Sequence, residues 1–521
     1  MLQYTCYNCL LIIKKYAYRT IIMLKMCYNC PVIIKSIKNR TISMIGRTKE
    51  QEELNRIYER KQTDLVVIYG RRRVGKTYLV NNTFKGRYAF HHTGLSPVNE
   101  SGKAVTLKDQ LESFYLSLQM YGMKKGARPT SWLEAFFMLK KLLTEKDDGS
   151  KQVVFIDELP WMDTKKSRFI TAFEEFYNGW CNERGNVMLI VCGSANSWIQ
   201  NKLINNKGGL YNRITHKIKL SPFTLKECEE YFLSQNIQFS RYDIAQSYMV
   251  FGGVPYYLGY MDGRLSLAQN IDRILFDENP MLKGEYENLF TSAFDKPTKT
   301  KKIVEFLFGR NLGYTRSEIS EKFSDISGSE LNKILSALEE SDFLIKYIPF
   351  SDGKREEKYR LSDPYCLTYL YFIKGQKKKE SFWQYNVNSS TLNTWRGLAF
   401  ENVCYRHYPQ IKKALEINGV EANMSMWIKE KNDDSEGTQI DLLIERADNV
   451  VNLCELKFYS GEFSVDSSYE EKMRTRDRLI MEKISRKKVV RNTLVTTYGL
   501  KKNAYSGIFT NVITMEGLFD C

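Results

Sequence analysis

A glycine-rich segment carries the clearest chemistry in this sequence. An apolar, β-branched run at residues 65–69 leads into a G-x4-G-K-T pattern, and the residues after it can continue as a helix. Glycine lets backbone N–H groups wrap around phosphate oxygens, and the lysine and threonine then reach the outer phosphates and Mg2+. A chance match in a basic loop is the alternative. We predict an ATP site with Mg2+, formed by Gly70, Arg71, Arg72, Arg73, Val74, Gly75, Lys76, Thr77 and Tyr78.

Two acids that follow a second apolar run are natural partners of this loop. The run QVVFI is followed directly by Asp157 and Glu158. An acid pair directly after an apolar strand is costly unless it faces a site. We expect Asp157 to hold Mg2+ through water and Glu158 to polarise the attacking water. An acid pair that only caps a helix is the alternative. A third run ends near Ser194 and Asn196, which are placed to sense the γ-phosphate.

A second pair of carboxylates is predicted near the C-terminus, and it depends on strand register. QIDLLIER and VVNLCELKF indicate two strands joined by a turn that ends in an asparagine, which tolerates the left-handed conformation needed there. A three-residue turn pairs Arg446 with Val450. The same register places Asp441 directly opposite Glu455, with Lys457 on the same face because side chains alternate along a strand.

This register would bring two negative charges together. Like charges directly opposite each other are destabilising, so a cation is needed between them. We expect a second Mg2+ or an Mn2+ at Asp441 and Glu455, which leaves Lys457 to position water or stabilise a phosphate oxyanion. A two-residue turn would flip one strand and separate the acids. A half-exposed strand with a surface Glu–Lys pair is the other interpretation.

The surrounding elements indicate an α/β protein. Apolar strands alternating with helical stretches are typical of a parallel three-layer core. Farther along, three helices followed by a hairpin indicate a winged helix, in which a capping box joins Thr315 to Glu318. In a DNA-binding form Lys333, Lys354 and Arg355 would meet phosphate. Three glutamates on the third helix instead favour a spacer or a partner-docking role.

Composition and charge indicate several domains and an anionic partner. The 521 residues exceed one ordinary core, so about three or four domains are expected. The net charge of +16 makes DNA a candidate partner. No charge-free apolar segment reaches about 20 residues, so no membrane-spanning helix is expected. The 11 cysteines form no disulfide framework, which favours a reducing cytoplasm.

The first 43 residues are basic and contain an internal repeat. Residues 6–23 and 27–44 repeat each other closely, and their cysteines follow C-x2-C-x17-C-x2-C, a spacing that fits a four-thiolate zinc site. The repeat preserves every kind of residue alike, not only the cysteines. We therefore favour a translated upstream duplication, with synthesis starting at Met44.

The loop and acid motifs resemble those of the AAA+ ATPases, specifically a prokaryotic ATPase family. Six segments follow each other in the same order as in that family, over residues 44–290. They are IGRTKEQEEL, GRRRVGKT, FIDELPW, CGSANSW, LYNRITHKIKLSPF and FGGVPYYLGY. The resemblance implies that Gly46 and Arg47 lie near the adenine and that the protein self-associates. It also implies that Arg213 is a sensor or finger arginine, although the family usually has Gly where Asn212 stands. An Arg213 that pairs with a surface acid is the alternative.

The C-terminal acids resemble the PD-(D/E)xK nuclease superfamily, a fold that the prokaryotic ATPase family often carries as a domain of unknown function. The D…E-x-K pattern follows a helix that contains LAFENV. The resemblance implies that Glu401 is an accessory acid and Lys457 the catalytic lysine. Asp441 and Glu455 would be metal ligands. Many relatives have a second acid where Gln439 stands.

Together these observations predict an α/β chain with a P-loop NTPase (AAA+-like) parallel sheet, a helical lid, a winged helix and a C-terminal restriction-endonuclease-like domain. The expected parts are an N-terminal extension (1–43), an ATPase core (44–219), a lid (220–295), a winged helix (296–365), a linker (366–394) and a nuclease-like domain (395–521).

Two functions are compatible with this organisation. In the first, the nucleotide cycle of a cytoplasmic ATPase controls a C-terminal domain that binds DNA or cleaves it with a metal. In the second, the protein is a nucleotide-switched regulatory or scaffold ATPase whose nuclease fold is inactive, because such folds often survive as binding modules. The two hypotheses share the nucleotide site and differ at the C-terminal acids.

Overall fold

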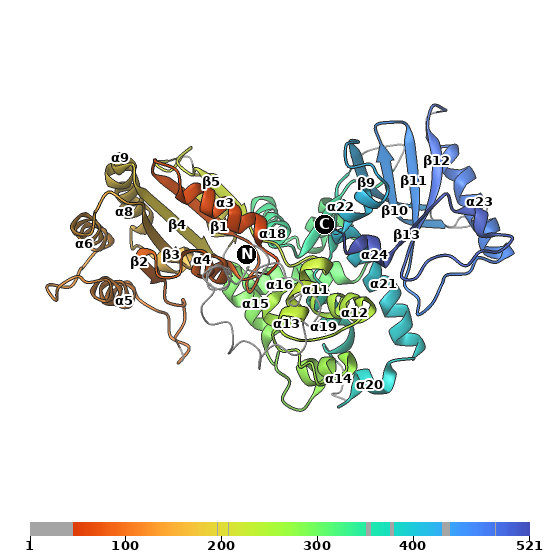
Figure 1. Ribbon diagram of the computed structural model, residues 1–521, viewed down its shortest axis with the longest axis horizontal. Coiled ribbons are helices and arrows are strands. Elements are labelled where there is room, and N and C mark those ends of the chain that lie inside the picture. Colours follow the sequence, from red (N-terminus) through yellow and green to blue (C-terminus); the bar gives the residue numbers. More distant parts are fainter. Residues whose placement is uncertain are drawn as a thin grey trace, which may run out of the picture. The chain divides into compact units, whose positions relative to one another are not determined.

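The computed structural model of the protein is organised around two five-stranded sheets and a small three-stranded sheet (Figure 1). It describes residues 45–99, 101–194, 196–206, 208–350, 356–375, 380–429, 438–484 and 486–520. The cysteines of the predicted zinc site lie outside the described residues.

The first sheet is parallel throughout, as predicted, with strand order β2-β3-β4-β1-β5. Strands β1, β3 and β4 are almost entirely buried, which explains why they appear in the sequence as continuous apolar runs without alternation. The strands are β1 (Asp64–Tyr69), β2 (Tyr88–Thr93), β3 (Gln152–Asp157), β4 (Val187–Gly193) and β5 (His216–Lys219).

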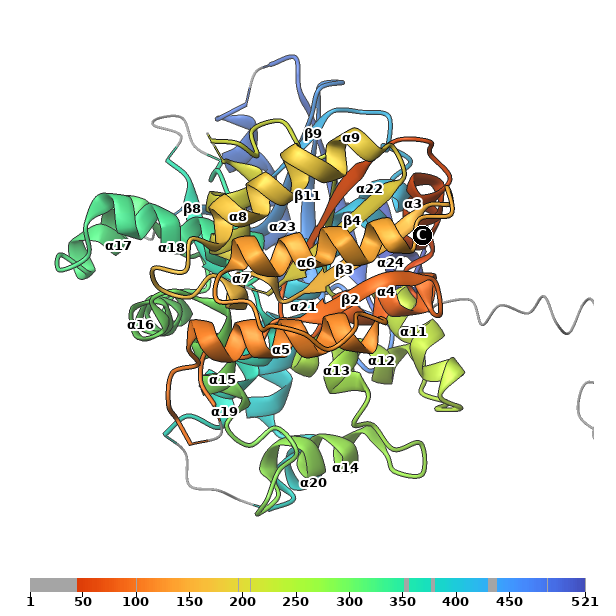
Figure 2. The ribbon, with the colours of Figure 1, turned by 90° about the vertical axis from the view of Figure 1, so that its left-hand side faces the viewer.

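Helices pack against this sheet, and α5, α6 and α8 lie in front of it in Figure 2. Leu65, Val154 and Leu189 belong to the buried cluster that these three helices share with the sheet. The helices are α3 (Thr48–Tyr58), α4 (Lys76–Phe84), α5 (Leu107–Met120), α6 (Trp132–Glu145), α7 (Leu159–Met162), α8 (Phe169–Phe176), α9 (Asn182–Arg184) and α10 (Asn196–Trp198), with π-helical turns at Tyr177–Cys181 and Ile199–Ile204.

A helical part follows the first sheet. Its entry is held by a close backbone contact, in which the Phe223 N–H donates to the Gly253 carbonyl oxygen at 2.6 Å. A Cβ at Gly253 would lie 1.9 Å from the Phe223 carbonyl oxygen, so only glycine fits there. The helices are α11 (Leu225–Ser234), α12 (Arg241–Phe251), α13 (Pro255–Leu258), α14 (Leu267–Ile271) and α15 (Glu285–Ala293), with a π-helical turn at Asp272–Phe276.

Three helices and a small antiparallel sheet come next, in strand order β6-β8-β7. The predicted capping box between Thr315 and Glu318 is confirmed at the start of α17. Lys333 is exposed on α18, whereas Lys354 and Arg355 lie outside the described residues. The elements are α16 (Pro297–Phe308), β6 (Tyr314–Thr315), α17 (Arg316–Lys322), α18 (Gly328–Glu340), β7 (Leu344–Tyr347) and β8 (Lys358–Leu361).

The C-terminal part is built on a mixed sheet with strand order β13-β12-β11-β10-β9. Strands β9, β10 and β11 are antiparallel neighbours, and β11, β12 and β13 run parallel. The strands are β9 (Ala422–Lys429), β10 (Thr438–Arg446), β11 (Val450–Lys457), β12 (Val489–Thr496) and β13 (Asn511–Thr514). The helices are α19 (Pro364–Phe372), α20 (Phe382–Asn386), α21 (Ser390–Arg406), α22 (Tyr408–Ala414), α23 (Ser467–Met481) and α24 (Met515–Leu518), with a 3-10 turn at Ser506–Ile508.

Strands β10 and β11 pair in the predicted register. Leu442 lies opposite Cys454 as predicted, and this pair ends the ladder just before Asp441 and Glu455. Asn449 in the turn has a φ of +66°, the left-handed conformation expected of it. The register prediction is therefore confirmed.

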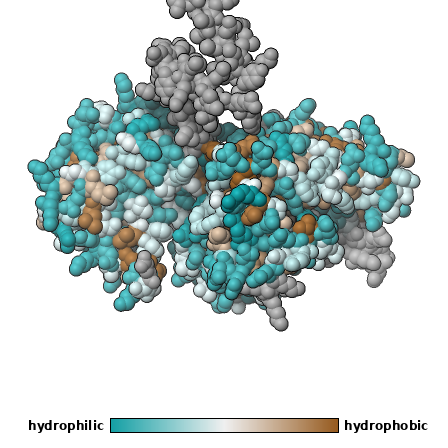
Figure 3. Space-filling view, turned by 60° about the horizontal axis from the view of Figure 1, so that its bottom comes forward, coloured by the Kyte–Doolittle hydropathy of each residue, from teal (hydrophilic) through white to brown (hydrophobic). Residues whose placement is uncertain are grey.

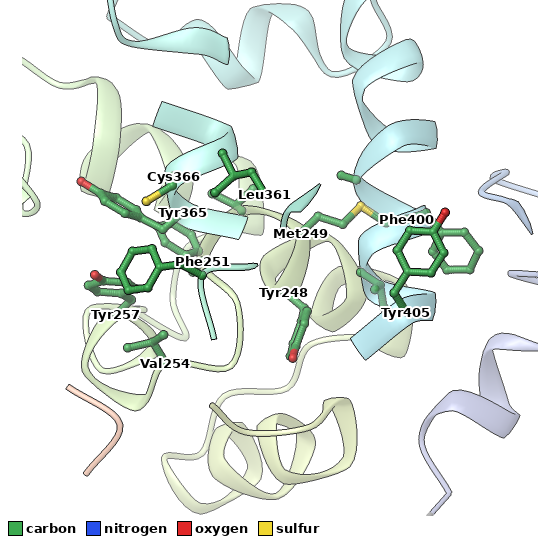
Figure 4. Packing of buried hydrophobic residues seen from close by; sticks show 14 of the residues in the cluster. Tyr248, Met249, Phe251, Val254, Tyr257, Leu361, Tyr365, Cys366, Phe400 and Tyr405 are labelled. Carbon is green, nitrogen blue, oxygen red and sulfur yellow. The ribbon is translucent and has the colours of Figure 1, made fainter. Parts of the chain in front are cut away.

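Two large buried apolar clusters are found among the described residues. One lies between the first sheet and helices α5, α6 and α8. The other extends from residue 223 to residue 519 and joins the helical part to one face of the C-terminal sheet. Figure 4 shows Met249 and Phe251 of α12 between Tyr365 of α19 and Phe400 of α21. Helix α12 is thus a central packing element of this second cluster.

The face seen in Figure 3 is mostly hydrophilic, and its apolar residues occur in separated groups. Within the described part of the chain, no helix has both the length and the apolar character needed to cross a membrane.

Candidate active sites

The phosphate loop joins β1 to α4 and has an unusual backbone. Gly70, Arg73 and Gly75 have positive φ angles of 138°, 72° and 91°. A Cβ at Gly70 would lie 2.2 Å from the Leu220 carbonyl oxygen, so this position needs glycine for space as well as for conformation. Left-handed residues inside a turn direct successive N–H groups to one point, which suits an anion at the start of α4.

The two side chains predicted to contact phosphate and Mg2+ are in place. The buried Lys76 Nζ donates to the carbonyl oxygens of Gly70 and Arg71 at 3.0 and 2.9 Å. Thr77 Oγ1 donates to Asp157 Oδ2 at 2.7 Å, which brings the two candidate Mg2+ ligands together. This pair suits Mg2+, which is usually held by one or two protein oxygens together with substrate phosphate and water.

Glu158 lies against the end of β4. Its carboxylate accepts hydrogen bonds from the Ser194 N–H at 3.1 Å and from Ser194 Oγ at 3.1 and 3.2 Å. Burial raises the pKa of Glu158, and the nearby Lys76 opposes that effect. Sequence reasoning missed Cys192, whose Sγ lies 2.6 Å from Asp157 Oδ1. Glu158 and Ser194, the side chain expected to sense the γ-phosphate, therefore contact each other.

The three arginines of the loop direct their side chains toward later helices, Arg71 to the start of α19 and the other two to α15. Arg71 pairs with Asp363 at 2.9 Å, and both side chains are only 1% exposed. Arg73 pairs with Glu285 at 2.7 Å, and Arg72 reaches a carbonyl oxygen of α15 at 3.5 Å. Burial alone would lower the pKa of Arg71, but the combined attraction of Asp363, Glu285 and neighbouring groups outweighs burial and raises the pKa. Because their side chains have these partners, we expect the three arginines to contact phosphate through their backbone N–H groups.

Arg47 links the loop to the start of the helical part. Its Nη2 donates to the carbonyl oxygens of Val74 at 3.1 Å and Ser221 at 2.7 Å. Gly46 has a φ of +65°, and a Cβ there would lie 2.9 Å from the Phe223 ring. The resemblance-based expectation that these residues lie near an adenine stays a prediction.

Arg213 and Tyr78 are both exposed. Asn212 has a φ of +53°, a conformation that glycine and asparagine adopt with little strain. Asparagine can therefore stand at this position in place of the family's glycine without changing the backbone. The sensor or finger role of Arg213 stays a prediction.

Glu455 of the C-terminal sheet is neutralised by two cations, of which sequence reasoning weighed Lys457 and missed Arg476. Glu455 is 5% exposed and pairs with Lys457 at 2.7 Å and with Arg476 of α23. Burial would raise the pKa of Glu455, but the two cations outweigh burial and lower it. The amide of Gln439, where many relatives have an acid, donates to Asp441 at 2.8 Å. A protein cation thus already supplies part of the charge that we assigned to a metal.

Asp441 lacks comparable compensation. Burial, together with Glu401 and Glu455, raises the pKa of Asp441 to about 7. The pairing of β10 with β9 shifts by one residue between Ile440 and Leu443, and such β-bulges often re-aim side chains at functional sites. The sheet therefore presents a carboxylate that still favours a nearby positive charge.

Glu401, the predicted accessory acid, has partners of its own. It pairs with the buried Arg360 at 3.2 Å and accepts a hydrogen bond from Asn311 at 2.9 Å. Within the described ranges, no group of three or more His, Cys, Asp or Glu side chains is arranged to hold a metal ion. Asp441 and Glu455 alone are a sufficient protein set for Mg2+, which keeps several water ligands.

A parallel α/β sheet, a glycine loop between β1 and α4, and an acid at the end of β3 that contacts the loop threonine define the class of P-loop ATPases. Residues 44–261 match the family described as an ATPase domain predominantly from Archaea. The match and the site geometry together support ATPase activity. The C-terminal carboxylates lie beyond the matched residues.

Comparisons with individual proteins cover more of the chain. An uncharacterised protein of Methanocaldococcus jannaschii is 24% identical over 381 residues, which are 71% of this chain and 78% of that protein. A Walker-type ATPase of Pyrococcus abyssi is 17% identical, with a TM-score of 0.43, over 63% of this chain and 96% of that one. The ORC2 protein of Aeropyrum pernix is 14% identical, with a TM-score of 0.37, over 62% and 92%.

Proposed function

We propose that the protein is an ATPase whose nucleotide cycle controls DNA binding or metal-dependent DNA cleavage by its C-terminal part. The observation that carries the cleavage proposal is the pairing of Leu442 with Cys454, which leaves Asp441 and Glu455 next to each other at the end of that ladder, with Lys457 paired to Glu455. Two carboxylates in this arrangement suit a divalent cation.

The ATPase half assigns one role to each residue. Bound Mg2+ neutralises phosphate charge, and Thr77 and Asp157 would hold it. Lys76 would leave the loop carbonyl oxygens and bind the outer phosphates instead. Glu158 would polarise the attacking water once Ser194 turns to the γ-phosphate, and Arg213 would stabilise the developing charge. Self-association, which the resemblance implies, would be tested by measuring molar mass with and without ATP.

Contacts of the loop arginines support control of the distant part by nucleotide. Asp363, the partner of Arg71, also accepts a hydrogen bond from the Cys366 N–H and so caps α19. Thr368 of α19 donates to the Val250 carbonyl oxygen of α12 at 3.3 Å. A change in loop conformation on nucleotide binding would therefore act directly on the helices that join the two sheets.

The cleavage half needs a metal and a freed lysine. A bound Mg2+ or Mn2+ would act as a Lewis acid on the phosphodiester. Asp441 and Glu455 would hold the metal, and Lys457 would exchange its contact with Glu455 for the phosphate oxyanion. The mixed sheet between α21 and α23 supports a restriction-endonuclease-like fold. The elements from α16 to β8 support a winged helix placed before it.

Plasmid DNA incubated with the purified protein, ATP and Mg2+ or Mn2+ tests the cleavage proposal. We expect wild-type protein to nick or linearise the plasmid. Lys457→Ala and Asp441→Ala should lose that activity while ATP hydrolysis continues. Cleavage that persists in both variants would rule out this site.

The second candidate is a nucleotide-switched scaffold whose C-terminal part binds without chemistry. Arg476 favours it, because together with Lys457 it already neutralises Glu455 without a metal. Calorimetric titration with Mn2+ separates the two proposals. Heat that disappears in Asp441→Ala supports the metal site, whereas no heat from wild-type protein supports the scaffold.

A further inference from the structure

A cavity of about 870 Å3 opens beside the C-terminal carboxylates. Its wall combines the start of α12, residues before and within α21, and the end of β11. Among its lining residues are Tyr242, Arg396, Gly397, Asp441, Lys457 and Phe458. The cavity thus places the proposed reacting groups at one side of a space large enough for a ligand.

Arg396 provides an anion-binding group in this wall. The residue is only 7% exposed, and its Nη1 donates to the Val387 carbonyl oxygen at 2.7 Å and to Asn393 Oδ1 at 2.9 Å. Its buried Nε finds no hydrogen-bond acceptor among the described residues. A guanidinium in a cavity wall suits phosphate, because guanidinium groups match phosphate geometry and are weakly hydrated.

An aromatic stack lines the same cavity as this arginine and the lysine. The Tyr242 ring stacks on Phe458 with 4.8 Å between centroids, and Phe458 directly follows Lys457 in the chain. The Tyr242 ring also stacks on Tyr498 at 5.9 Å. Aromatic rings next to cations are typical of proteins that bind unpaired nucleic acid, because every base has a face that can stack.

Three acids among the described residues line the wall, and each already contacts another group; Asp441 accepts a hydrogen bond from the Gln439 amide at 2.8 Å. Glu401 pairs with Arg360. Asp243 accepts a hydrogen bond from Ser240 Oγ at 2.6 Å at the start of α12. The cations of the wall therefore remain the groups best placed to meet a phosphate.

The size of the cavity restricts the ligand. The cavity volume of about 870 Å3 lies within the range of small-molecule pockets, about 300–1,000 Å3. A cavity of this size is too small to enclose a stacked duplex. Enzymes that act on nucleic acid in such pockets take unpaired or extruded nucleotides. The ligand should therefore be a few unpaired nucleotides.

We propose that this cavity binds an unpaired nucleic-acid strand, with one phosphate at Lys457, a neighbouring phosphate at Arg396 and a base against the Tyr242–Phe458 stack. The inference rests on the proposed function for the identity of the reacting phosphate. Binding itself requires neither cleavage nor a metal.

Strand binding can be measured without cleavage in EDTA. The full chain is titrated into fluorescein-labelled single-stranded DNA, single-stranded RNA and blunt duplex DNA, and anisotropy is recorded. We expect single strands to bind about tenfold or more tightly than duplex. The DNA and RNA arms identify which strand is preferred.

Gly397 offers a way to fill the cavity. A Cβ at Gly397 meets no atom within 4 Å, so Gly397→Trp should fold and place its indole in the cavity. The matched control is Gly419→Trp, where a Cβ likewise meets nothing but the residue does not line the cavity. We expect Gly397→Trp to abolish strand binding and Gly419→Trp to leave it unchanged, with ATP hydrolysis retained in both.

Arg396→Met tests the anion site, with Arg474→Met as control because the Arg474 side chain is 67% exposed on α23. We expect strand affinity to fall about tenfold in the first variant only. If Arg396→Met fails to fold, Gly397→Trp decides. Duplex binding as tight as strand binding, unaffected by Gly397→Trp, would overturn the inference even if cleavage is observed. Strand binding blocked by Gly397→Trp, without cleavage by wild-type protein, would support the cavity and refute the nuclease proposal.

Discussion

The nucleotide site and the C-terminal site both combine two acids with a lysine, but they satisfy these charges differently. At the first, Lys76 contacts carbonyl oxygens of its own loop and Asp157 accepts from Thr77. At the second, Glu455 is directly paired with Lys457 and with a further arginine. At the first site the charged side chains contact neutral partners, whereas at the second site they form ion pairs with each other.

This difference has a consequence for activation. Phosphate and Mg2+ can replace the neutral partners of the loop lysine and Asp157 with charged ones, so ligand binding at the nucleotide site gains electrostatic energy. A metal at the proposed C-terminal site would have to compete with two existing cations for Glu455. The proposed site would therefore have the stronger barrier to loading, and Asp441 would be its most available ligand.

Loss of Lys76 should give the largest effect on the nucleotide side of the comparison. Lys76→Ala removes the cation that is expected to bind the outer phosphates, so ATP hydrolysis should fall about 100-fold or more. The control is Lys85→Ala, an exposed lysine just after α4. Calorimetry should show unchanged Mn2+ binding at the C-terminal part. A steady-state rate close to that of wild type would contradict the assignment.

Breaking the buried ion pair between loop and helix should cost stability. Arg71→Met leaves Asp363 buried without its partner, which should lower the free energy of unfolding by about 3–5 kcal/mol. Urea unfolding followed by fluorescence measures this change. The control is Lys301→Met, which removes one member of an exposed pair and should leave the free energy of unfolding without a measurable change. Equal effects of the two substitutions would show that Arg71 and Asp363 do not form a buried pair in solution.

The raised pKa of Asp441 predicts a pH-dependent effect of Asp441→Asn. The folded protein binds this proton more tightly than the unfolded chain, because the folded pKa is about 7 and the ordinary value 3.8. The resulting stabilisation is complete below about pH 4 and is lost as the pH rises to about 7. In EDTA, the Asn variant should therefore melt above wild type at pH 8, and the difference should disappear near pH 4. A difference in melting temperature that does not change with pH would show that the charge of Asp441 is not its cause.

The smallest effect is expected from removing the competing arginine. Arg476→Met should strengthen Mn2+ binding several-fold, because the metal no longer competes with that guanidinium for Glu455. Arg474→Met, two residues away and exposed, should leave affinity unchanged. Titration calorimetry measures both variants. Unchanged or weaker binding in Arg476→Met would mean that Glu455 is not a metal ligand.

Much of the nucleotide site could be predicted because its parts are local. The loop glycines, Lys76 and Thr77 lie within eight residues of chain, and Asp157 and Glu158 end a recognisable apolar run. The C-terminal pair could also be predicted, because turn length determines register and Asn449 marked the turn. In both cases the positions of the side chains follow from local backbone geometry, the loop conformation in the first case and the turn length in the second.

The partners that complete these sites could not be predicted. Asp363 lies 292 residues from Arg71 and belongs to no motif. Nothing in the sequence of α23 indicates that Arg476 rather than a neighbouring arginine turns toward Glu455. Helix α12 gave no sign that Tyr242 would stack against the residue after Lys457.

By itself, the sequence determined the phosphate loop, the parallel order of apolar strands around it and the opposition of Asp441 to Glu455, because each follows from local conformation and strand periodicity. Only the tertiary structure decided which charges neutralise these groups and which side chains line the cavity beside them. Those contacts depend on how distant helices pack, and packing is governed by the summed burial of many apolar side chains rather than by any short pattern.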